Sequence, residues 1–408
     1  MSRAAQILPS RATVVVLWVL AVGIAGVLVY ARYRSAIGDG VWFDFTHYFL
    51  PSGEAVRSGQ SPYVVDGYVY SPMIAALVAV TLGFAKPIAV WTIFNLLAAV
   101  TVIVLLTATL WASLRPWQRP CFAAAAFATL MWNWLTTLML SSGQTDLYVM
   151  VALGVASLAA SRHSAVGAGT GIAIAALTKT WPVVVGLWFF RRGAFKRGTT
   201  VISAVTTGLI AIIVLVMIWG PESITAWLAA VLDARSQPGL IHFNVQSMGN
   251  QIFGNGPGTD ASMSMPWPAA LVTIGGVVTM LGLLGIALWW PGDDVLSLWH
   301  VTFVLVLLLP VSHSVYLLLG LPVLWIWFAR FLRTPSRPSV FFTLAIWVVW
   351  WIVSARIQWS GDTFTTMSTL GYATVMLCSV AALAISVVIE ARSRTDAPQP
   401  RRNAQSGR

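Results

Sequence analysis

The sequence contains little charge. Only 9% of its 408 residues are Asp, Glu, Lys or Arg, whereas a soluble globular domain carries roughly 25%. Hydrophobic residues make up 58% of the chain, and the few charges form short clusters between apolar runs. This pattern excludes a water-soluble fold and is typical of a membrane protein, so the net charge of +11 does not indicate nucleic-acid binding.

Cysteine is scarce as well, and several common motifs are missing. The two cysteines, Cys121 and Cys378, lie in or beside apolar runs, so they support neither a disulfide framework nor a cysteine metal site. The sequence has no Walker loop, no dinucleotide-binding glycine pattern, no GxSxG elbow and no paired-histidine metal spacing. We therefore expect no metal and no cofactor, and nucleotide-driven and serine-hydrolase chemistry lose support.

Apolar runs are abundant instead. Because a bilayer core requires about 20 apolar residues per helix, these runs predict an all-α polytopic membrane protein with about twelve transmembrane helices. The first run lacks a small-residue cleavage site and is interpreted as a retained helix rather than a signal peptide. The predicted spans are Val14–Tyr30, Met73–Phe84, Trp91–Trp111, Phe122–Leu140, Leu147–Ala160, Gly167–Phe190, Thr200–Trp219, Trp267–Trp290, Trp299–Val311, Val315–Phe331, Val340–Val353 and Leu370–Ile389.

The basic clusters predict sidedness, because cytoplasmic loops collect Lys and Arg. The densest clusters begin at Arg191, Arg330 and Arg392 and are placed inside, with both termini. Residues 1–391 are then one membrane domain, and 392–408 form a disordered basic cytoplasmic tail that could contact anionic lipid. Three long stretches fall on the other side: Ala31–Pro72, Gly220–Pro266 and Ser354–Thr369.

One part of this topology is not fixed by the charge pattern. Arg115 and Arg119 fall outside if Met73–Phe84 is a full span. That run is short, however, and ends at Lys86-Pro87, so it is alternatively re-entrant or continuous with its neighbour. The topology between Met73 and Phe190 therefore stays open at this point.

The first outer stretch carries acidic residues among aromatics and glycines, which is unusual for a simple connection. These acids are Asp39, Asp44, Glu54 and Asp66. The residues around Asp44 suggest an amphipathic segment at the membrane surface that would hold a carboxylate just above the lipid. Asp44 is therefore a candidate catalytic residue. The alternative is that it caps this segment or is solvated.

Polar residues also interrupt the apolar runs. Lys179 lies in an otherwise uncharged stretch, and an ionisable residue at membrane depth is a functional candidate because leaving it unpaired is costly. A cation there would suit a phosphate; alternatively Lys179 snorkels toward an interface near Pro182. Gln144 and Asp146 lie in a turn between two spans, where the alternative is a plain polar turn.

Further candidates lie in the second and third outer stretches. The segment with His242, Asn244, Gln246, Ser247 and Asn250 suits sugar or phosphate recognition, but it equally suits a capped interfacial helix. His313 lies at the outer end of two spans, where a histidine can orient a phosphate, shuttle a proton or simply complete a turn. Arg356 and Asp362 are candidates without a motif.

The order of these elements resembles glycosyltransferase family 87, over most of the chain. In that family the motifs follow a fixed order along the chain. An acidic residue and a glycine come first, then a Pro-Tyr pair, a Tyr-x-Pro motif at the start of the next span and a GQxN turn. A Lys-x-x-Pro motif, an Asn-x-x-Ser pattern and a late histidine motif follow. Here they are Asp44, Gly59, Pro62-Tyr63, Tyr70-Ser71-Pro72, Gly143 to Asp146, Lys179 to Pro182, Asn244 to Ser247 and Ser312-His313. Two departures occur: Asp146 replaces the usual asparagine, and Ser312-His313-Ser314 lacks the tryptophan and the second histidine.

The resemblance implies a fold of the GT-C class, with interfacial helices in a long first periplasmic loop, and transfer of a sugar from a polyprenyl-phosphate donor. The sequence is similar to those of actinobacterial phosphatidylinositol mannoside and lipoglycan mannosyltransferases. This likeness implies that the sugar is mannose and that the acceptor is a glycolipid or lipoglycan. It also implies an active site on the outer face of the plasma membrane. Asp44 would be the general base of an inverting displacement. Lys179, His313, Arg57 and Arg356 would bind the donor phosphate, and Tyr63, Tyr70, Gln144, Asp146, Asn244 and Ser247 would contact substrate.

Two alternatives are kept. An arabinofuranosyltransferase of the same class is the nearest within the enzymes. A transporter or flippase for a lipid or small solute would also explain many spans with interior polar residues. Transporters often have halves related by an internal repeat, and none is visible here, so the enzyme is favoured.

Overall fold

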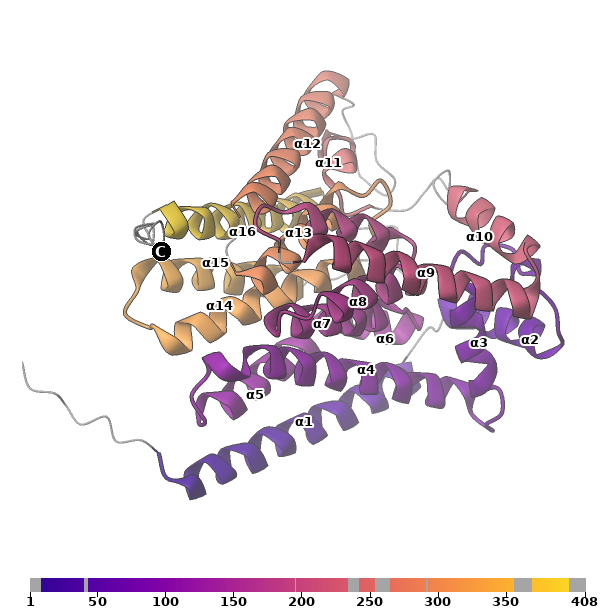
Figure 1. Ribbon diagram of the computed structural model, residues 1–408, viewed down its shortest axis with the longest axis horizontal. Helices are drawn as coiled ribbons and strands as arrows, with labels where there is room; N and C mark the ends of the chain where they lie inside the picture. Colours follow the sequence, from indigo (N-terminus) through magenta and orange to yellow (C-terminus); the bar gives the residue numbers. More distant parts are fainter. Residues whose placement is uncertain are drawn as a thin grey trace, which may run out of the picture.

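The structure is a computed structural model that describes residues 9–39, 43–194, 196–233, 242–253, 265–290, 293–355 and 369–395, and in these ranges every regular element is helical (Figure 1). The α-helices are α1 Arg11–Asp39, α2 Leu50–Arg57, α3 Pro72–Thr81, α4 Pro87–Leu110, α5 Gln118–Met131, α6 Trp134–Ser142, α7 Asp146–Ser161, α8 Ala165–Thr178, α9 Arg197–Trp219, α10 Glu222–Asp233, α11 Val245–Phe253, α12 Pro266–Trp289, α13 Asp294–Leu308, α14 Leu321–Arg333, α15 Pro338–Ala355 and α16 Thr369–Thr395. Shorter π and 3-10 segments are η1 Phe45–Phe49, η2 Pro62–Val64, η3 Trp111–Ser113, η4 Trp181–Phe190 and η6 Ser314–Gly320.

The predicted all-α polytopic class is confirmed. By length and composition, 7 helices in the described ranges can cross a membrane, or 8 if the bent pair α5 and α6 is one span. The remaining apolar runs are also helical but shorter, so the predicted total of twelve spans stays a prediction. Helices form throughout because backbone N–H and C=O groups have no water to bond with in hydrocarbon.

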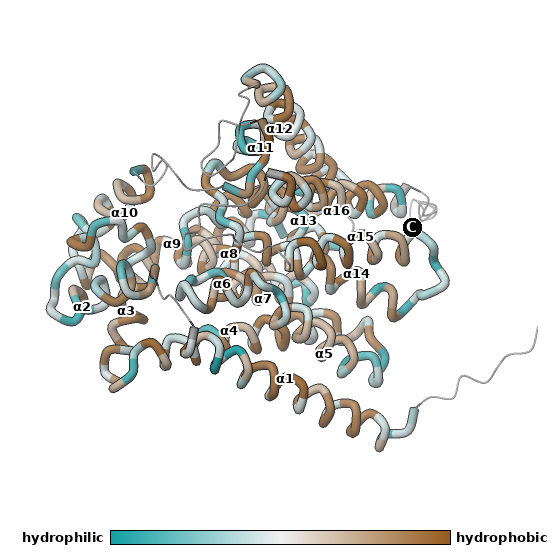
Figure 2. Tube along the Cα trace, turned by 180° about the vertical axis from the view of Figure 1, so that it is seen from behind, coloured by the Kyte–Doolittle hydropathy of each residue, from teal (hydrophilic) through white to brown (hydrophobic). Residues whose placement is uncertain are grey.

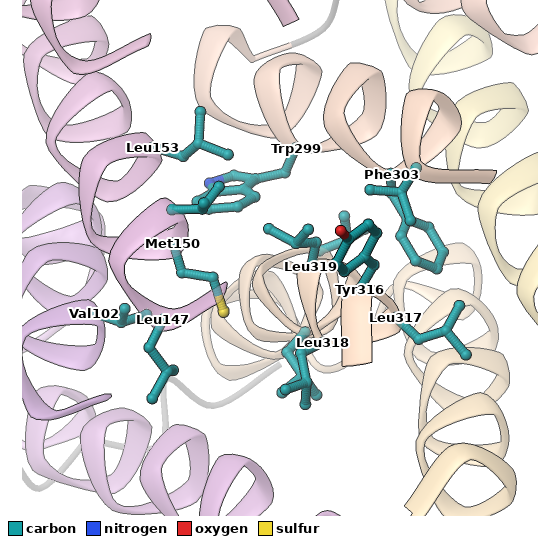
Figure 3. Packing of buried hydrophobic residues seen from close by; sticks show 14 of the residues in the cluster. Val102, Leu147, Met150, Leu153, Trp299, Phe303, Tyr316, Leu317, Leu318 and Leu319 are labelled. Carbon is teal, nitrogen blue, oxygen red and sulfur yellow. The ribbon is translucent and has the colours of Figure 1, made fainter. Parts of the chain in front are cut away.

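The outer helices and the central helices differ in what they bury. The long helices α1, α9 and α12 expose apolar side chains, such as Val19, Met217 and Ile274, and Figure 2 shows hydrophobic colour along most of α1. In contrast, α13 is buried over nearly its whole length. Around it, Met150 and Leu153 of α7 lie near Trp299, and Leu317, Leu318 and Leu319 of η6 belong to the same buried cluster as Phe303 (Figure 3).

The predicted span Met73–Phe84 is not a full crossing. Helix α3 has 10 residues, which gives about 15 Å of length, half the thickness of a hydrocarbon core. It packs on α2: a Cβ at Gly53 would lie 2.8 Å from Val78, and the Arg57 guanidinium donates to the Leu82 carbonyl (2.8 Å). This run therefore forms a short helix beside α2 rather than a transmembrane helix of full length.

The predicted span Gly167–Phe190 is two legs rather than one. Helix α8 ends at Thr178, and a 3-10 segment, η4, begins at Trp181. Pro182 cannot donate a backbone hydrogen bond, so it favours a break here. The chain doubles back, because Lys179 lies beside Asp146 at the start of α7 (2.9 Å), whereas Arg191 at the end of η4 pairs with Asp294 (2.7 Å).

These two corrections settle the position of Arg115 and Arg119. The side chain of Gln118 donates to the Leu332 carbonyl (2.5 Å), so the connection between α4 and α5 lies beside the end of α14. We call this the basic end, defined by Arg115, Arg192, Arg330, Arg333 and Arg337. The alternative in which Arg115 lies opposite the other basic clusters followed only from a full crossing at Met73–Phe84, for which the 10 residues of α3 are too few.

The opposite end of the molecule holds the turn at Gly143, where the Trp91 indole donates to the Gly143 carbonyl (2.9 Å). Helix α4 starts near this turn and its last residues approach the basic end. Its 24 residues correspond to about 36 Å, which is sufficient to separate two membrane surfaces.

The stretches predicted on the outer side differ in detail from expectation. Helix α1 continues to Asp39, so the first stretch begins later than Ala31 and contains η1, α2 and η2. The second stretch contains α10 and α11. Most of the third, including Arg356 and Asp362, lies outside the described residues. Helix α16 runs to Thr395, which is beyond the predicted start of the tail at Arg392, and residues 396–408 also lie outside the described ranges.

Candidate active site

Asp44 is placed by the aromatic residues that follow it. It directly precedes η1, whose Phe45 and Phe49 are fully buried. Both rings pack on Trp91 of α4, with ring centroids 5.6 Å and 5.9 Å away. The side chain of Asp44 does not cap this segment. Its carboxylate instead accepts a hydrogen bond from the Gln144 amide, 100 residues away in sequence.

The Gly143-Gln144 turn fixes that contact. Gly143 ends α6 in the left-handed conformation, with φ +80°, which favours glycine. A Cβ at Gly143 would lie 2.7 Å from the Phe45 Cβ. Because only glycine fits this close approach, the backbone of the turn at Gly143 packs directly against the Phe45 side chain, next to Asp44.

Gln144 connects three candidate side chains. Its amide nitrogen donates to Asp44, and its carbonyl oxygen accepts from the Tyr70 hydroxyl (2.8 Å) and the Lys179 ammonium (3.3 Å). Tyr63 helps to hold Tyr70 in position, because its hydroxyl donates to the Tyr70 carbonyl (2.7 Å). The structure therefore brings together Asp44, Tyr70, Gln144 and Lys179, which the sequence analysis singled out separately.

Lys179 forms a buried ion pair with Asp146. The ammonium lies 2.9 Å and 3.0 Å from the two carboxylate oxygens, and the exposed fractions are 5% for Lys179 and 0% for Asp146. The ammonium also lies 4.4 Å from the Tyr316 ring centroid and 5.5 Å from that of Tyr70. Lys179 is thus a fixed cation in the site and does not snorkel to solvent.

The environment of Asp44 makes its carboxyl a weaker acid. Burial raises the pKa of Asp44 to about 6, while the Gln144 hydrogen bond and the charge of Lys179 act in the opposite direction. A carboxyl with this pKa is ionised at neutral pH and has more proton affinity than an ordinary aspartate. These are the properties that a general base requires.

Two histidines and a tyrosine line the next part of the site. Tyr316 packs against His313, which packs against His242, with ring centroids 5.6 Å and 6.1 Å apart. Burial, and then the nearby charge of Lys179, lower the pKa of His313 to about 3. His313 is therefore a neutral hydrogen-bonding group rather than a second cation.

Asn244 and Ser247 support this region from α11. The Asn244 side chain accepts from the Ser247 backbone N–H (2.7 Å) and donates to the Pro310 carbonyl (3.0 Å). The Phe243 N–H donates to the Ser312 carbonyl (2.6 Å). The segment is thus a capped helix start that holds the loop before His313 in place, as one of the two interpretations of the sequence anticipated.

One predicted phosphate ligand, Arg57, is not joined to this cluster by the described contacts. Arg57 is exposed on α2, and its guanidinium donates to the Leu82 carbonyl. Arg356 lies outside the described residues. Conversely, the sequence analysis missed Tyr316 and Trp181, whose rings lie 5.8 Å apart. Trp181 follows Lys179 by two positions and Tyr316 follows His313 by three. Their closeness in sequence to these two candidates is the feature that could have identified them.

Several buried polar atoms around the cluster have no hydrogen-bond partner among the described residues. They are Ser71 Oγ, Thr145 Oγ1, Trp181 Nε1, His242 Nδ1 and Ser312 Oγ. Burying such groups without a partner costs about 1–3 kcal/mol each. The described residues contain no group of three His, Cys, Asp or Glu side chains able to hold a metal ion.

The comparison with known families now adds to this geometry. A family model described as glycosyltransferase family 87 matches residues 68–312, which is more than half of the chain. No curated protein matches the sequence. The matched part contains Tyr70, Gln144, Asp146 and Lys179, and it ends just before His313. Asp44 precedes it and joins the matched part through Gln144.

Proposed function

The chain belongs to glycosyltransferase family 87 and is a multi-pass membrane glycosyltransferase, and we propose that it uses a polyprenyl-phosphate sugar as donor, with Asp44 as general base. The observation that carries this proposal is the contact chain from Asp44 through Gln144 to Lys179. In this chain a carboxylate and an ammonium group contact the same amide side chain at one end of the bundle, which supports the proposal. Family membership also favours an enzyme over the transporter alternative.

The proposed reaction is a single displacement. The acceptor hydroxyl attacks the anomeric carbon and gives its proton to Asp44, and a new glycosidic C–O bond forms. The bond between the anomeric carbon and the phosphate oxygen breaks, and polyprenyl phosphate leaves with the bonding electrons. The configuration at the anomeric carbon inverts. Asp44 suits this role because it is partly exposed and ionised at neutral pH.

The leaving phosphate requires donors and positive charge. Lys179 supplies the charge, and Tyr70, Tyr316 and neutral His313 are the hydroxyl and imidazole groups around it. Asp146 already accepts two hydrogen bonds from Lys179, so the phosphate would share the ammonium with this carboxylate. Arg57 and Arg356 stay in the proposal only as outer ligands, since the described contacts do not join Arg57 to this cluster.

The distribution of charge supports an active site on the outer face of the plasma membrane. Arg115, Arg192, Arg330, Arg333 and Arg337 gather at the basic end, and the positive-inside rule assigns that end to the cytoplasm. The termini would then be cytoplasmic as well. The Asp44 cluster lies at the opposite end of α4 and α7, where a lipid-linked donor could present its sugar to water while its isoprenoid chain stays in the bilayer.

For the substrates we propose mannose as the sugar and a glycolipid or lipoglycan as the acceptor. This choice follows the resemblance of the motif order to phosphatidylinositol mannoside and lipoglycan mannosyltransferases. Arabinofuranose is the alternative sugar. Membranes containing the enzyme should incorporate label from polyprenyl-phosphate mannose, and mass spectrometry should detect a lipoglycan intermediate one mannose short after deletion of the gene. Incorporation from the arabinofuranosyl donor alone would reverse the assignment.

The decisive test of the mechanism replaces the proposed base. Asp44→Asn should lower kcat by about 100-fold or more, as expected for removal of a general base, with a smaller effect on donor binding. Asp66→Asn is the matched control, because Asp66 is an exposed acid in the same outer stretch. Turnover of Asp44→Asn near the wild-type rate would remove Asp44 from the mechanism.

A further inference from the structure

A cavity lies at the basic end, far from Asp44. Its volume is about 520 Å³, which is large enough for a lipid headgroup or another small ligand. The ends of α4, α7 and α14, the start of α13 and the loop after η4 line it. Its charged lining residues are Arg192, Asp293, Asp294, Arg330 and Arg333.

The carboxylates at this cavity already have partners. Asp294 pairs with Arg191 (2.7 Å), and Glu390, behind the cavity wall, pairs with Arg330. Asp293 caps α13 by accepting from the Val295 N–H (2.8 Å). The acidic side chains are therefore bound within the protein.

Two arginines remain for a ligand. In the ranges that the structure describes, neither Arg192 nor Arg333 forms an ion pair. Both side chains are exposed and both line the cavity. Among the lining residues and their ion-pair partners, four arginines face three carboxylates, which leaves an excess of one positive charge. A phosphodiester, with one negative charge, would neutralise it.

Tryptophans place the cavity at headgroup level. Trp111 and Trp289 are 43% and 58% exposed, and exposed indoles concentrate at membrane interfaces. Trp111 lies between two lining residues, and the Arg192 guanidinium is 5.5 Å from the Trp289 ring centroid. Apolar side chains complete the lining, namely Leu110, Val295, Ile326 and Ala329. A ligand here would contact the arginine side chains on one side and the apolar lining side chains on the other.

We propose that this cavity binds the phosphodiester headgroup of an anionic phospholipid through Arg192 and Arg333. The site lies at the other end of the bundle from the glycosyl-transfer cluster, so the proposal does not depend on the identity of the sugar or on the role of Asp44. Basic pockets between membrane helices are known to bind anionic headgroups, and each nearby Lys or Arg contributes about 1 kcal/mol.

The test measures lipid retention by the full chain in nanodiscs. Native mass spectrometry would count phosphatidylglycerol retained against a phosphatidylcholine background. The Arg192→Gln/Arg333→Gln variant should bind phosphatidylglycerol about 10- to 30-fold more weakly. The matched control is Arg162→Gln/Arg337→Gln, which removes the same charge from exposed residues that do not line the cavity.

The controls distinguish the possible results. Unchanged retention in the cavity variant, or equal loss in both variants, would overturn the proposal, because the second result would indicate general surface attraction. The charge-conserving variant Arg192→Lys/Arg333→Lys should retain most of the lipid. Thermal unfolding would show whether each variant is folded. If Arg192→Gln/Arg333→Gln does not fold, the single variant Arg333→Gln takes its place in the same measurement. Glycerol phosphate should not displace the lipid at matched concentration. If it does, the ligand is a soluble phosphate compound and the lipid assignment is wrong.

Discussion

The ammonium of Lys179 lies 2.9 Å and 3.0 Å from the two carboxylate oxygens of Asp146, and both side chains are buried. The cation of the proposed active site is thus already neutralised by a residue 33 positions earlier in the chain. Breaking a buried pair by removing one partner is costly, because the other charge is left without compensation. This pair therefore determines how the roles of Lys179 and Asp146 can be tested.

We expect Asp146→Asn to bind the donor phosphate more tightly than the wild type. The substitution keeps an acceptor for Lys179 but removes the negative charge that competes with the phosphate. The free energy of unfolding of the protein without donor should fall by about 3–5 kcal/mol, since the buried ammonium loses its counter-charge. Binding of polyprenyl phosphate and a thermal unfolding curve would measure the two effects. Weaker binding would show that Asp146 orients Lys179 for the ligand rather than competing with it.

The contribution of Lys179 is best measured in the double variant Lys179→Met/Asp146→Asn. A single Lys179→Ala change would leave Asp146 buried without its partner and could unfold the site. The double variant carries no uncompensated charge, so it should fold. Its affinity for polyprenyl phosphate should be at least about tenfold below that of Asp146→Asn, because a charge-assisted hydrogen bond is lost. Equal affinities would remove Lys179 from phosphate binding.

The pH dependence of the reaction should report on Asp44. Because burial raises the pKa of Asp44 to about 6, kcat/KM should fall as the pH decreases through about 6 and the base becomes protonated. Gln144→Leu removes a hydrogen bond that lowers this pKa, so the acidic limb should move to higher pH. Asp66→Asn serves as the control whose profile should match the wild type. A limb that does not move in Gln144→Leu would contradict the assigned contact.

Gly143→Ala should impair catalysis through Phe45. Alanine disfavours the left-handed conformation by about 1–2 kcal/mol, and its Cβ would lie 2.7 Å from the Phe45 Cβ. The resulting shift would move the neighbouring Asp44, so kcat should fall by about tenfold or more, since small misplacements of a catalytic group are costly. Gly208→Ala in α9 is the matched control, as a Cβ there meets no atom within 4 Å. Wild-type kcat in Gly143→Ala would show that the turn tolerates rearrangement.

Membrane orientation gives an independent prediction. In a background with Cys121 and Cys378 replaced by alanine, Asp66→Cys should react with a membrane-impermeant maleimide on intact cells. Arg337→Cys, at the basic end, should react only after the membrane is permeabilised. Both original residues are exposed in the structure, so failure to label reflects sidedness rather than burial. The reverse labelling pattern would place the Asp44 cluster in the cytoplasm and overturn the proposed site of reaction.

Helix class and several site residues could be predicted from the sequence. Uncharged runs must be helical in a bilayer, because the backbone has to satisfy its own hydrogen bonds there, and all the predicted spans are helical to a large extent. Lys179 stood out since a charge in an apolar run is expensive. Hydropathy alone, however, could not tell a crossing helix from α3, or one span from the two legs α8 and η4, because it measures composition and not direction.

The sequence by itself therefore determined that this chain lies in a membrane as helices, and which polar residues interrupt them. Only the tertiary structure decided that Asp44, Gln144 and Lys179 meet in one cluster, that Asp146 neutralises the lysine, and that Arg115 lies with the other arginines at the basic end. The physical reason is that these contacts join residues far apart in the chain. Their geometry depends on how the helices pack and where the chain turns, which no local pattern of residues encodes.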